Sequence, residues 1–156
     1  YLQVTDLRVD DLPAAEELVA RGVAAGILKP RTRQQIARMM IGGLGARLIR
    51  TGHLAGLVGL EVDAYGVAGV GEVSALITVS EFSGAGAGGL LISALLKRAL
   101  DRGLTSVFAV TVSDDAAAFF LHRGFTEVSR DDVPPGKWTG YHPERLARAR
   151  CFTWVL

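Results

Sequence analysis

The feature that most constrains this chain is the succession of a strand-like run, a loop of small residues and an apolar helical run in its middle. Residues 72–82, EVSALITVSEF, are rich in the apolar and β-branched residues typical of a strand. Residues 83–89, SGAGAGG, are all Gly, Ala or Ser. In residues 90–100, LLISALLKRAL, Leu91 and Leu95 lie on one face, and this spacing predicts an amphipathic helix.

A loop of this composition between a strand and a helix is suited to binding an anion. Glycine adopts backbone dihedrals that other residues resist, and small side chains let backbone N–H groups approach a ligand closely. The first turn of the helix adds unpaired N–H groups and the positive end of the helix dipole. The sequence therefore predicts a seat for a pyrophosphate or another anion at residues 83–89.

Three alternative interpretations of this loop fit the sequence less well. A P-loop would carry Lys followed by Ser or Thr after its last glycine, and this loop continues with two leucines. A dinucleotide-binding fold would place its glycine-rich turn after the first strand, whereas about half of this chain precedes the loop. A flexible linker seldom joins a well-formed strand directly to a well-formed helix.

The composition predicts one globular domain over residues 1–156, with 49% hydrophobic and 21% charged residues. A net charge of +1 offers no basic excess for nucleic acid. No apolar run is long enough to span a membrane and we recognise no signal peptide, so we expect no membrane partner and a cytoplasmic location. Cys151 is the only cysteine, which excludes an internal disulfide, and with 3 histidines we expect no metal site.

The order of the predicted elements indicates an α/β (α+β) fold with a mixed sheet. After a first strand, Pro13 lies just inside one helix, and Thr32 with Gln35 forms a capping box that opens a second. An antiparallel meander of three strands then leads to the glycine-rich loop. The predicted strands are residues 2–7, 46–50, 53–65, 67–80, 105–113, 125–129 and 148–156.

These elements, in this order, resemble the fold of the Gcn5-related N-acetyltransferases, the GNAT superfamily. The loop looks like the acetyl-CoA loop of that superfamily, whose pattern is Arg/Gln-x-x-Gly-x-Gly/Ala, and residues 119–125 resemble its Phe-Tyr…Gly-Phe pattern. The resemblance implies a GNAT acyl-CoA N-acyltransferase fold, a mixed central sheet flanked by helices, with acetyl-CoA as co-substrate. The loop residues that would hold the cofactor are Ser83, Gly84, Ala85, Gly86, Ala87, Gly88 and Gly89.

A narrower resemblance links three segments to the acetyltransferase domain of N-acetylglutamate synthases. Residues 26–40, 71–82 and 133–150 are similar to three motifs of that family, in the same order. The resemblance implies transfer of acetyl from acetyl-CoA to the amine of a small amino acid, first of all L-glutamate, in arginine biosynthesis. The chain shows no amino-acid-kinase domain, which classical synthases carry, so the match is to a short form or to a domain detached from a fusion. As partners, a second copy in a homodimer and fusion to another metabolic enzyme both stay open.

Two departures from the superfamily pattern keep other functions open. Ser83 replaces the basic or amide residue that often begins the loop, and Phe120 stands where many acetyltransferases carry a tyrosine that acts as general acid. One alternative is therefore a GNAT acetyltransferase for another small amine, such as a polyamine or an antibiotic, or for a protein N-terminus. Another is a non-catalytic acyl-CoA-binding module.

Acetyl transfer to an amine needs a base, an acid and a site for the developing oxyanion. Glu72 is the candidate base, because an acid in an apolar strand is costly without a task or a partner; the alternative is a strand-end residue at the solvent rim. Ser113 is the candidate acid for the leaving thiolate; the alternative is a helix N-cap. Backbone N–H groups of Leu76, Ile77 and Thr78 would bind the thioester oxygen.

An amino-acid substrate also brings carboxylates, for which guanidinium groups are well suited. The candidate substrate-binding residues are Arg31, Lys137, Arg145 and Arg148. The resemblance supports Arg31 and Arg145 most directly, because each lies in a matched segment, and we expect them to hold the same carboxylate. The three histidines gain no role, and Cys151 is interpreted as a packed residue rather than a nucleophile.

Overall fold

The computed structural model describes residues 1–79 and 86–156 of the chain. These residues form two compact units, one of residues 1–61 with 74–98 and one of residues 62–73 with 99–156. That the two units act as one domain stays a prediction.

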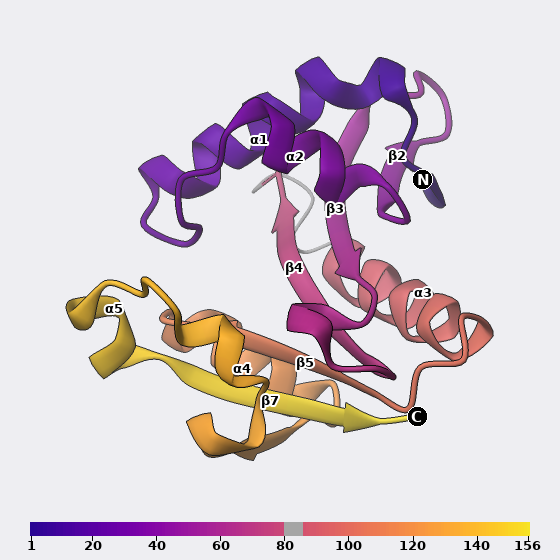
Figure 1. The fold of residues 1–156 in the computed structure, drawn as a ribbon. Coiled ribbons are helices and arrows are strands. Elements are labelled where there is room, and N and C mark those ends of the chain that lie inside the picture. The colour runs from indigo at the N-terminus through magenta and orange to yellow at the C-terminus, as the bar shows by residue number, and fades with distance from the viewer. Residues whose placement is uncertain (80–85) are drawn as a thin grey trace. The chain divides into compact units, whose positions relative to one another are not determined.

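The first unit contains the N-terminal strands and helices (Figure 1). Its elements are β1 (Leu2–Asp6), η1 (Val9–Asp11), α1 (Leu12–Ala24), α2 (Arg33–Met40), β2 (Leu44–Leu48), β3 (Leu54–Glu61), the second half of β4 (Val70–Thr78) and most of α3 (Ala87–Asp101). Strand β2 pairs antiparallel with both β1 and β3.

The second unit contains the C-terminal elements and the first half of β4. Its further elements are η2 (Ala64–Gly66), β5 (Ser106–Thr111), α4 (Asp114–His122), β6 (Thr126–Val128), η4 (Arg130–Asp132), η5 (Pro135–Trp138), α5 (Pro143–Arg148) and β7 (Arg150–Val155). Strand β5 pairs parallel with β4 and antiparallel with β7, which also pairs antiparallel with β6.

The strands form a seven-stranded sheet in the order β1-β2-β3-β4-β5-β7-β6. Because β4 and β5 are parallel and the other described pairs are antiparallel, the sheet is mixed, and helices flank it. This confirms the predicted fold class. The position of β5 between β4 and β7 also agrees with its nearly continuous apolar sequence, since both faces of a central strand are covered.

Local sequence signals account for both N-terminal helices. Pro13 lies in the first turn of α1, where its missing N–H costs no hydrogen bond. The predicted capping box begins α2. The backbone N–H of Gln35 donates to the Thr32 hydroxyl over 3.1 Å, and the backbone N–H of Thr32 donates to the side-chain oxygen of Gln35 over 2.8 Å. The two helices lie side by side in Figure 1 and share one apolar core with β3 and β4.

Helix α2 approaches the sheet closely at Gly59 of β3. A Cβ atom at this glycine would lie 2.2 Å from the Ser74 hydroxyl oxygen and 2.4 Å from Cγ of Met39. Any side chain at position 59 would therefore force the side chains of Ser74 and Met39 to shift.

The strand predicted for residues 53–65 is wrong at its end, because β3 stops at Glu61. Asp63 and Tyr65 have positive φ angles of 50° and 54°, which no strand residue adopts. The side chain of Asp63 accepts a hydrogen bond of 2.8 Å from the Gly69 N–H, which helps to close this turn. Alternation of apolar residues continues past Glu61, so the sequence pattern alone did not reveal the break.

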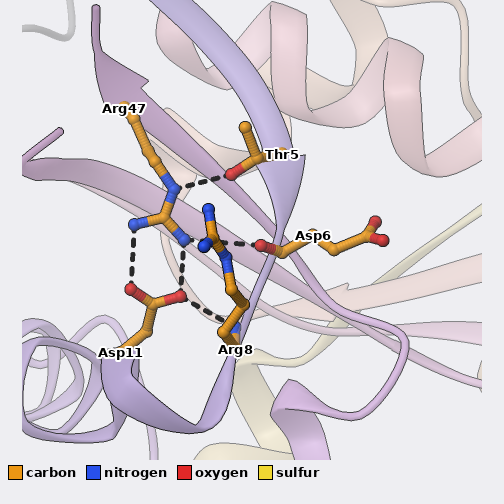
Figure 2. A network of polar contacts seen from close by, with 5 residues as sticks. All are labelled: Thr5, Asp6, Arg8, Asp11 and Arg47. Carbon is orange, nitrogen blue, oxygen red and sulfur yellow. Dashed lines mark hydrogen bonds and ion pairs between the residues drawn. The ribbon is translucent and has the colours of Figure 1, made fainter.

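An arginine and an aspartate join the start of α1 to the sheet in the first unit (Figure 2). The Arg47 guanidinium donates to both carboxylate oxygens of Asp11, over 2.8 and 2.5 Å, and its Nε donates to the Thr5 hydroxyl over 2.6 Å. The Arg8 backbone N–H donates to the same carboxylate over 2.8 Å. The register of β2 shifts between Ala46 and Arg47, an irregularity of the kind that re-aims a side chain.

Replacement of Arg47 by Met should lower the free energy of unfolding by about 3 kcal/mol at neutral pH. The two side chains are only 11% and 13% exposed, so the substitution leaves the Asp11 charge poorly compensated. The hydrogen bond from Arg47 also holds the pKa of Asp11 below its ordinary value. This stabilisation is therefore present at neutral pH and is lost as the pH falls through that lowered pKa, below about 4.

Urea unfolding of both proteins at neutral and acidic pH measures the effect. The matched control is Arg21→Met, which removes an ion pair with Glu17 whose side chains are 58% and 68% exposed. It should change the free energy of unfolding by less than about 0.5 kcal/mol. An Arg47→Met effect no larger than this control would contradict the prediction.

Candidate functional site

Glu72 lies in the first half of β4 and is buried. Its carboxylate oxygen Oε2 is 2.6 Å from Nζ of Lys137, and the two side chains are 5% and 9% exposed. The alternative of a strand-end residue at the solvent rim is therefore wrong. A buried acid in an apolar strand requires a partner, and for Glu72 this partner is Lys137, itself one of the predicted site residues.

Lys137 reaches this carboxylate because the short helix η5 is anchored on both sides. The indole N–H of Trp138 donates to the Arg130 carbonyl over 3.2 Å, and Trp138 packs against a buried cluster of the second unit to which Val133 belongs. A Cβ atom at Gly136 would lie 3.0 Å from Cβ of Tyr65, so a larger residue there would force Tyr65 to shift by a few tenths of an ångström.

Two tyrosines complete the surroundings of the ion pair. Nζ of Lys137 lies 6.0 Å from the ring centroid of Tyr65 and 5.9 Å from that of Tyr141, within the range of a cation–π interaction. Tyr65 was missed because the sequence placed it inside a strand. Tyr141 could have been found, since it lies in the matched segment of residues 133–150.

The charges of this cluster reinforce one another. Burial alone would lower the pKa of Lys137, but the negative charge and hydrogen bond of Glu72 outweigh it and raise that pKa above its ordinary value. Burial, and next the charge of Glu72, raise the pKa of the Tyr65 phenol. Lys137 is therefore an ammonium and Tyr65 a neutral phenol throughout the neutral pH range.

Ser113 is the N-cap residue of α4. Its hydroxyl accepts a hydrogen bond of 3.3 Å from the Ala116 N–H, as the alternative interpretation predicted. A capping hydroxyl still carries one hydrogen that it can donate. A role of Ser113 as proton donor to a thiolate stays a prediction.

The predicted cofactor loop is described in part. Ser83, Gly84 and Ala85 lie outside the described residues. Gly86 is exposed with φ of +80°, and its carbonyl accepts from the Leu90 N–H over 3.0 Å at the start of α3. The remaining loop residues, Ala87, Gly88 and Gly89, form the first turn of that helix.

The predicted N–H donors for the thioester oxygen lie at the end of β4. Ile77 is buried, whereas Leu76 and Thr78 are half-buried. Just beyond them, the Val79 N–H donates to the Ala55 carbonyl of β3 over 2.8 Å. Their contact with a thioester stays a prediction.

Arg31 lies in the turn before α2, in the first unit. Its guanidinium donates to the Ser74 carbonyl over 2.5 Å and to the Lys29 carbonyl over 3.3 Å. The hydroxyl of Ser74 is buried and has no hydrogen-bond partner among the described residues. Arg31 is therefore bound to the backbone of the strand that also carries Glu72.

The two remaining predicted carboxylate ligands, Arg145 and Arg148, lie on α5 in the second unit. Arg148 is exposed, whereas Nε of Arg145 is buried without a hydrogen-bond partner among the described residues. Because Arg31 and Arg145 belong to different units, their joint hold on one carboxylate stays a prediction.

The described residues contain no candidate metal site. Among residues 1–79 and 86–156, no group of three or more His, Cys, Asp or Glu could hold a metal ion. No helix within the same residues is long and apolar enough to cross a membrane.

The family model of the Acetyltransferase (GNAT) family matches residues 20–125 of the chain. The chain therefore belongs to the GNAT acetyltransferase family. This range includes Arg31, Glu72, Ser113 and the whole predicted cofactor loop, but not the segment that carries Lys137.

Solved structures of similar fold include proteins in complex with coenzyme A. N-acetylglutamate synthase from Neisseria gonorrhoeae, in complex with coenzyme A and N-acetyl-glutamate, superposes with a TM-score of 0.86 at 22% identity. The match covers 100% of this chain but 35% of that protein, so this chain spans about a third of its length. Rv2747 from Mycobacterium tuberculosis, in complex with CoA and NLQ, gives a TM-score of 0.78 at 22% identity and covers 99% of each chain.

The same fold also serves a protein-modifying enzyme. The ribosomal-protein-S18-alanine N-acetyltransferase from Escherichia coli gives a TM-score of 0.66 at 18% identity over 98% of this chain and 91% of that one. At such identities the likeness shows the fold alone, and the acceptor must be argued from the residues of this chain.

We expect Cys151 to be unreactive in the folded protein, because burial raises the pKa of its thiol to about 11. At slightly alkaline pH the reactive thiolate is then roughly a thousandfold rarer than the thiol. Titration with Ellman's reagent should find no rapidly reacting thiol in the native protein and one per chain in guanidinium chloride. Rapid labelling of the native protein would reopen a role for this cysteine as nucleophile.

Proposed function

We propose that this domain transfers the acetyl group of acetyl-CoA to the amine of a small amino acid, with L-glutamate as the first candidate. The observation that carries the proposal is the buried pair of Glu72 and Lys137, held 2.6 Å apart next to two tyrosine rings. A carboxylate and an ammonium at one place match the ammonium and the carboxylate of an amino acid.

The comparisons support a donor and an acceptor of this kind. Two proteins of the same fold were solved with coenzyme A, one of them together with N-acetyl-glutamate. With L-glutamate as acceptor, the reaction of this chain would belong to arginine biosynthesis in the cytoplasm.

The chemistry assigns a task to each predicted residue. Glu72 takes one proton from the substrate ammonium, and the neutral amine attacks the thioester carbon. Backbone N–H groups of Leu76, Ile77 and Thr78 stabilise the oxyanion that forms. The C–S bond then breaks, and the CoA sulfur takes up a proton from Ser113, the proposed donor. Ser113 recovers this proton from the nitrogen, which loses its second proton as the amide forms.

The substrate carboxylates are assigned to cationic side chains. Arg31 and Arg145 carry the larger part of this proposal, because each lies in a segment similar to the synthases and can make a two-point contact with a carboxylate. Lys137 and Arg148 are the further candidates, and Lys137 is the one that already meets a carboxylate, that of Glu72.

The proposal is tested by thiol release from acetyl-CoA against a panel of free amino acids and carboxylate-free amines. We expect an amino acid to be the best acceptor, with L-glutamate first. Glu72→Gln should lower the turnover rate by roughly a hundredfold or more while CoA binding is kept, because the amide cannot accept the proton.

The outcomes of this assay separate the alternatives. A carboxylate-free amine as best acceptor would indicate an acetyltransferase for another amine. CoA binding without acetylation of any acceptor would indicate a non-catalytic acyl-CoA-binding module. Wild-type turnover in Glu72→Gln would move the base to another residue.

A second prediction concerns the CoA loop. Gly86→Val should abolish CoA binding in calorimetry, because a side chain there would block the backbone from the pyrophosphate. The fold should survive the change at a cost of about 1–2 kcal/mol for the left-handed dihedral, since a Cβ atom at Gly86 would meet no atom of the described residues within 4 Å.

Gly52 offers a matched control for this variant. It lies between β2 and β3 with a φ of +75°, and a Cβ atom there would meet nothing within 4 Å in the described part of the chain. Gly52→Val should therefore cost a similar amount of stability and leave CoA affinity unchanged. Equal CoA affinities for the two variants would show that the loop assignment is wrong.

A further inference from the structure

The pair of Glu72 and Lys137 is not accounted for by stability alone. Both side chains are nearly excluded from water, at 5% and 9% exposure. Removing two charges from water costs about as much as their attraction returns, and apolar side chains of similar size are often at least as stabilising. If one charge loses its partner, however, the other is left buried and uncompensated.

The surroundings of Lys137 would let its ammonium stay in place when its partner changes. An ammonium group has three N–H donors, and within the described part of the chain Glu72 is the only ion-pair partner of Lys137. The rings of Tyr65 and Tyr141 lie about 6 Å from Nζ, at 6.0 and 5.9 Å. Aromatic rings attract a cation but do not neutralise its charge as a carboxylate does. The ammonium of Lys137 can therefore still bind a new anion.

Tyr65 connects this buried pair to the surface. Tyr65 is 45% exposed, and the charges of both Glu72 and Lys137 act on its phenol group. The backbone of Tyr65 is held at φ of 54° and ψ of 31°, a conformation that is uncommon for a bulky residue. Contact with Gly136 fixes the tyrosine against the turn that carries Lys137.

We propose that the substrate opens this ion pair with its own two charges. The α-carboxylate replaces Glu72 as the partner of Lys137, and the α-ammonium takes the freed carboxylate of Glu72. This inference rests on the proposed function and specifies the acceptor as an α-amino acid bound as a zwitterion. One buried pair becomes two, so every charge has a partner both before and after the exchange.

The exchange also prepares the reaction. Once the ammonium lies on Glu72, one N–H bond breaks and an O–H bond forms on the carboxylate, which leaves a neutral amine with its lone pair free. An amine without a carboxylate cannot reach this state equally well, because it would separate Glu72 from Lys137 and leave the ammonium of Lys137 unpaired. Selectivity for amino acids therefore follows from a penalty on the wrong substrate.

Calorimetry in the presence of CoA tests the exchange without turnover. The ligands are L-glutamate, 4-aminobutyrate, which lacks the α-carboxylate, and glutarate, which lacks the amine. Wild-type protein should bind L-glutamate about a hundredfold or more tightly than either analogue. Lys137→Met should lose the preference for L-glutamate over 4-aminobutyrate, and Glu72→Gln the preference for L-glutamate over glutarate.

Two further variants separate this role from a structural one. Exchange of the charges, Glu72→Lys with Lys137→Glu, keeps a buried pair. Its melting temperature should lie closer to that of the wild type than those of the single variants do, but it should not bind L-glutamate. Glu17→Gln is the matched control, since it opens an ion pair whose side chains are 58% and 68% exposed, and it should bind like the wild type.

The results that would overturn the inference are specific. The first is that 4-aminobutyrate binds the wild-type protein as tightly as L-glutamate does. The second is that Lys137→Met keeps its affinity for L-glutamate within about threefold of the wild type (about 0.7 kcal/mol). The third is that the charge-exchanged variant binds L-glutamate with wild-type affinity. If the thiol-release panel finds another amino acid to be the acceptor, that amino acid and its decarboxylated amine take the place of the probes. Acetylation of an amino acid by a Lys137→Met protein with normal affinity would overturn the exchange and leave the proposed function standing. Failure of every amino acid to bind or react would overturn both.

Discussion

A carboxylate on a covered strand has to meet a positive charge, and in this chain Glu72 of β4 meets Lys137 of η5 over 2.6 Å. This contact joins η5 to the sheet strand β4 within the second unit. Two contacts help to position Lys137: the Trp138 indole N–H donates to the Arg130 carbonyl, and Gly136 packs closely against Tyr65. An irregular segment thereby acquires a definite structure without belonging to the sheet.

The first unit contains a second charged contact of a different kind. Arg47 donates to both oxygens of Asp11 and also to Thr5, so its guanidinium is well occupied (Figure 2). Such a saturated arrangement joins η1 to the sheet and leaves little capacity for a ligand. Lys137, with one carboxylate partner and two aromatic neighbours, keeps donors for a second anion. This difference is why we assign a functional role to the second contact and a structural role to the first.

The position of Phe120 illustrates how a family pattern is altered by packing. Its ring stacks on Phe152 at 5.8 Å and contacts Phe125 at 5.1 Å, and the residue is buried. A tyrosine hydroxyl at this place would need a partner within that aromatic cluster. Phe120 carries no hydroxyl, so it cannot donate a proton to the CoA thiolate, which is why Ser113 enters the proposed chemistry as the donor.

Much of the fold was predictable from sequence because its signals are local. The capping box of Thr32 and Gln35, the helix after the glycine-rich loop and the apolar strand β5 each depend on neighbouring residues. The sequence by itself also determined that Glu72 needs a task or a partner. Only the tertiary structure decided that the partner is Lys137 and that Tyr65 adjoins it, because these contacts join segments far apart along the chain. Local periodicity carries no information on such pairings, and a positive φ at a tyrosine has no signature in composition.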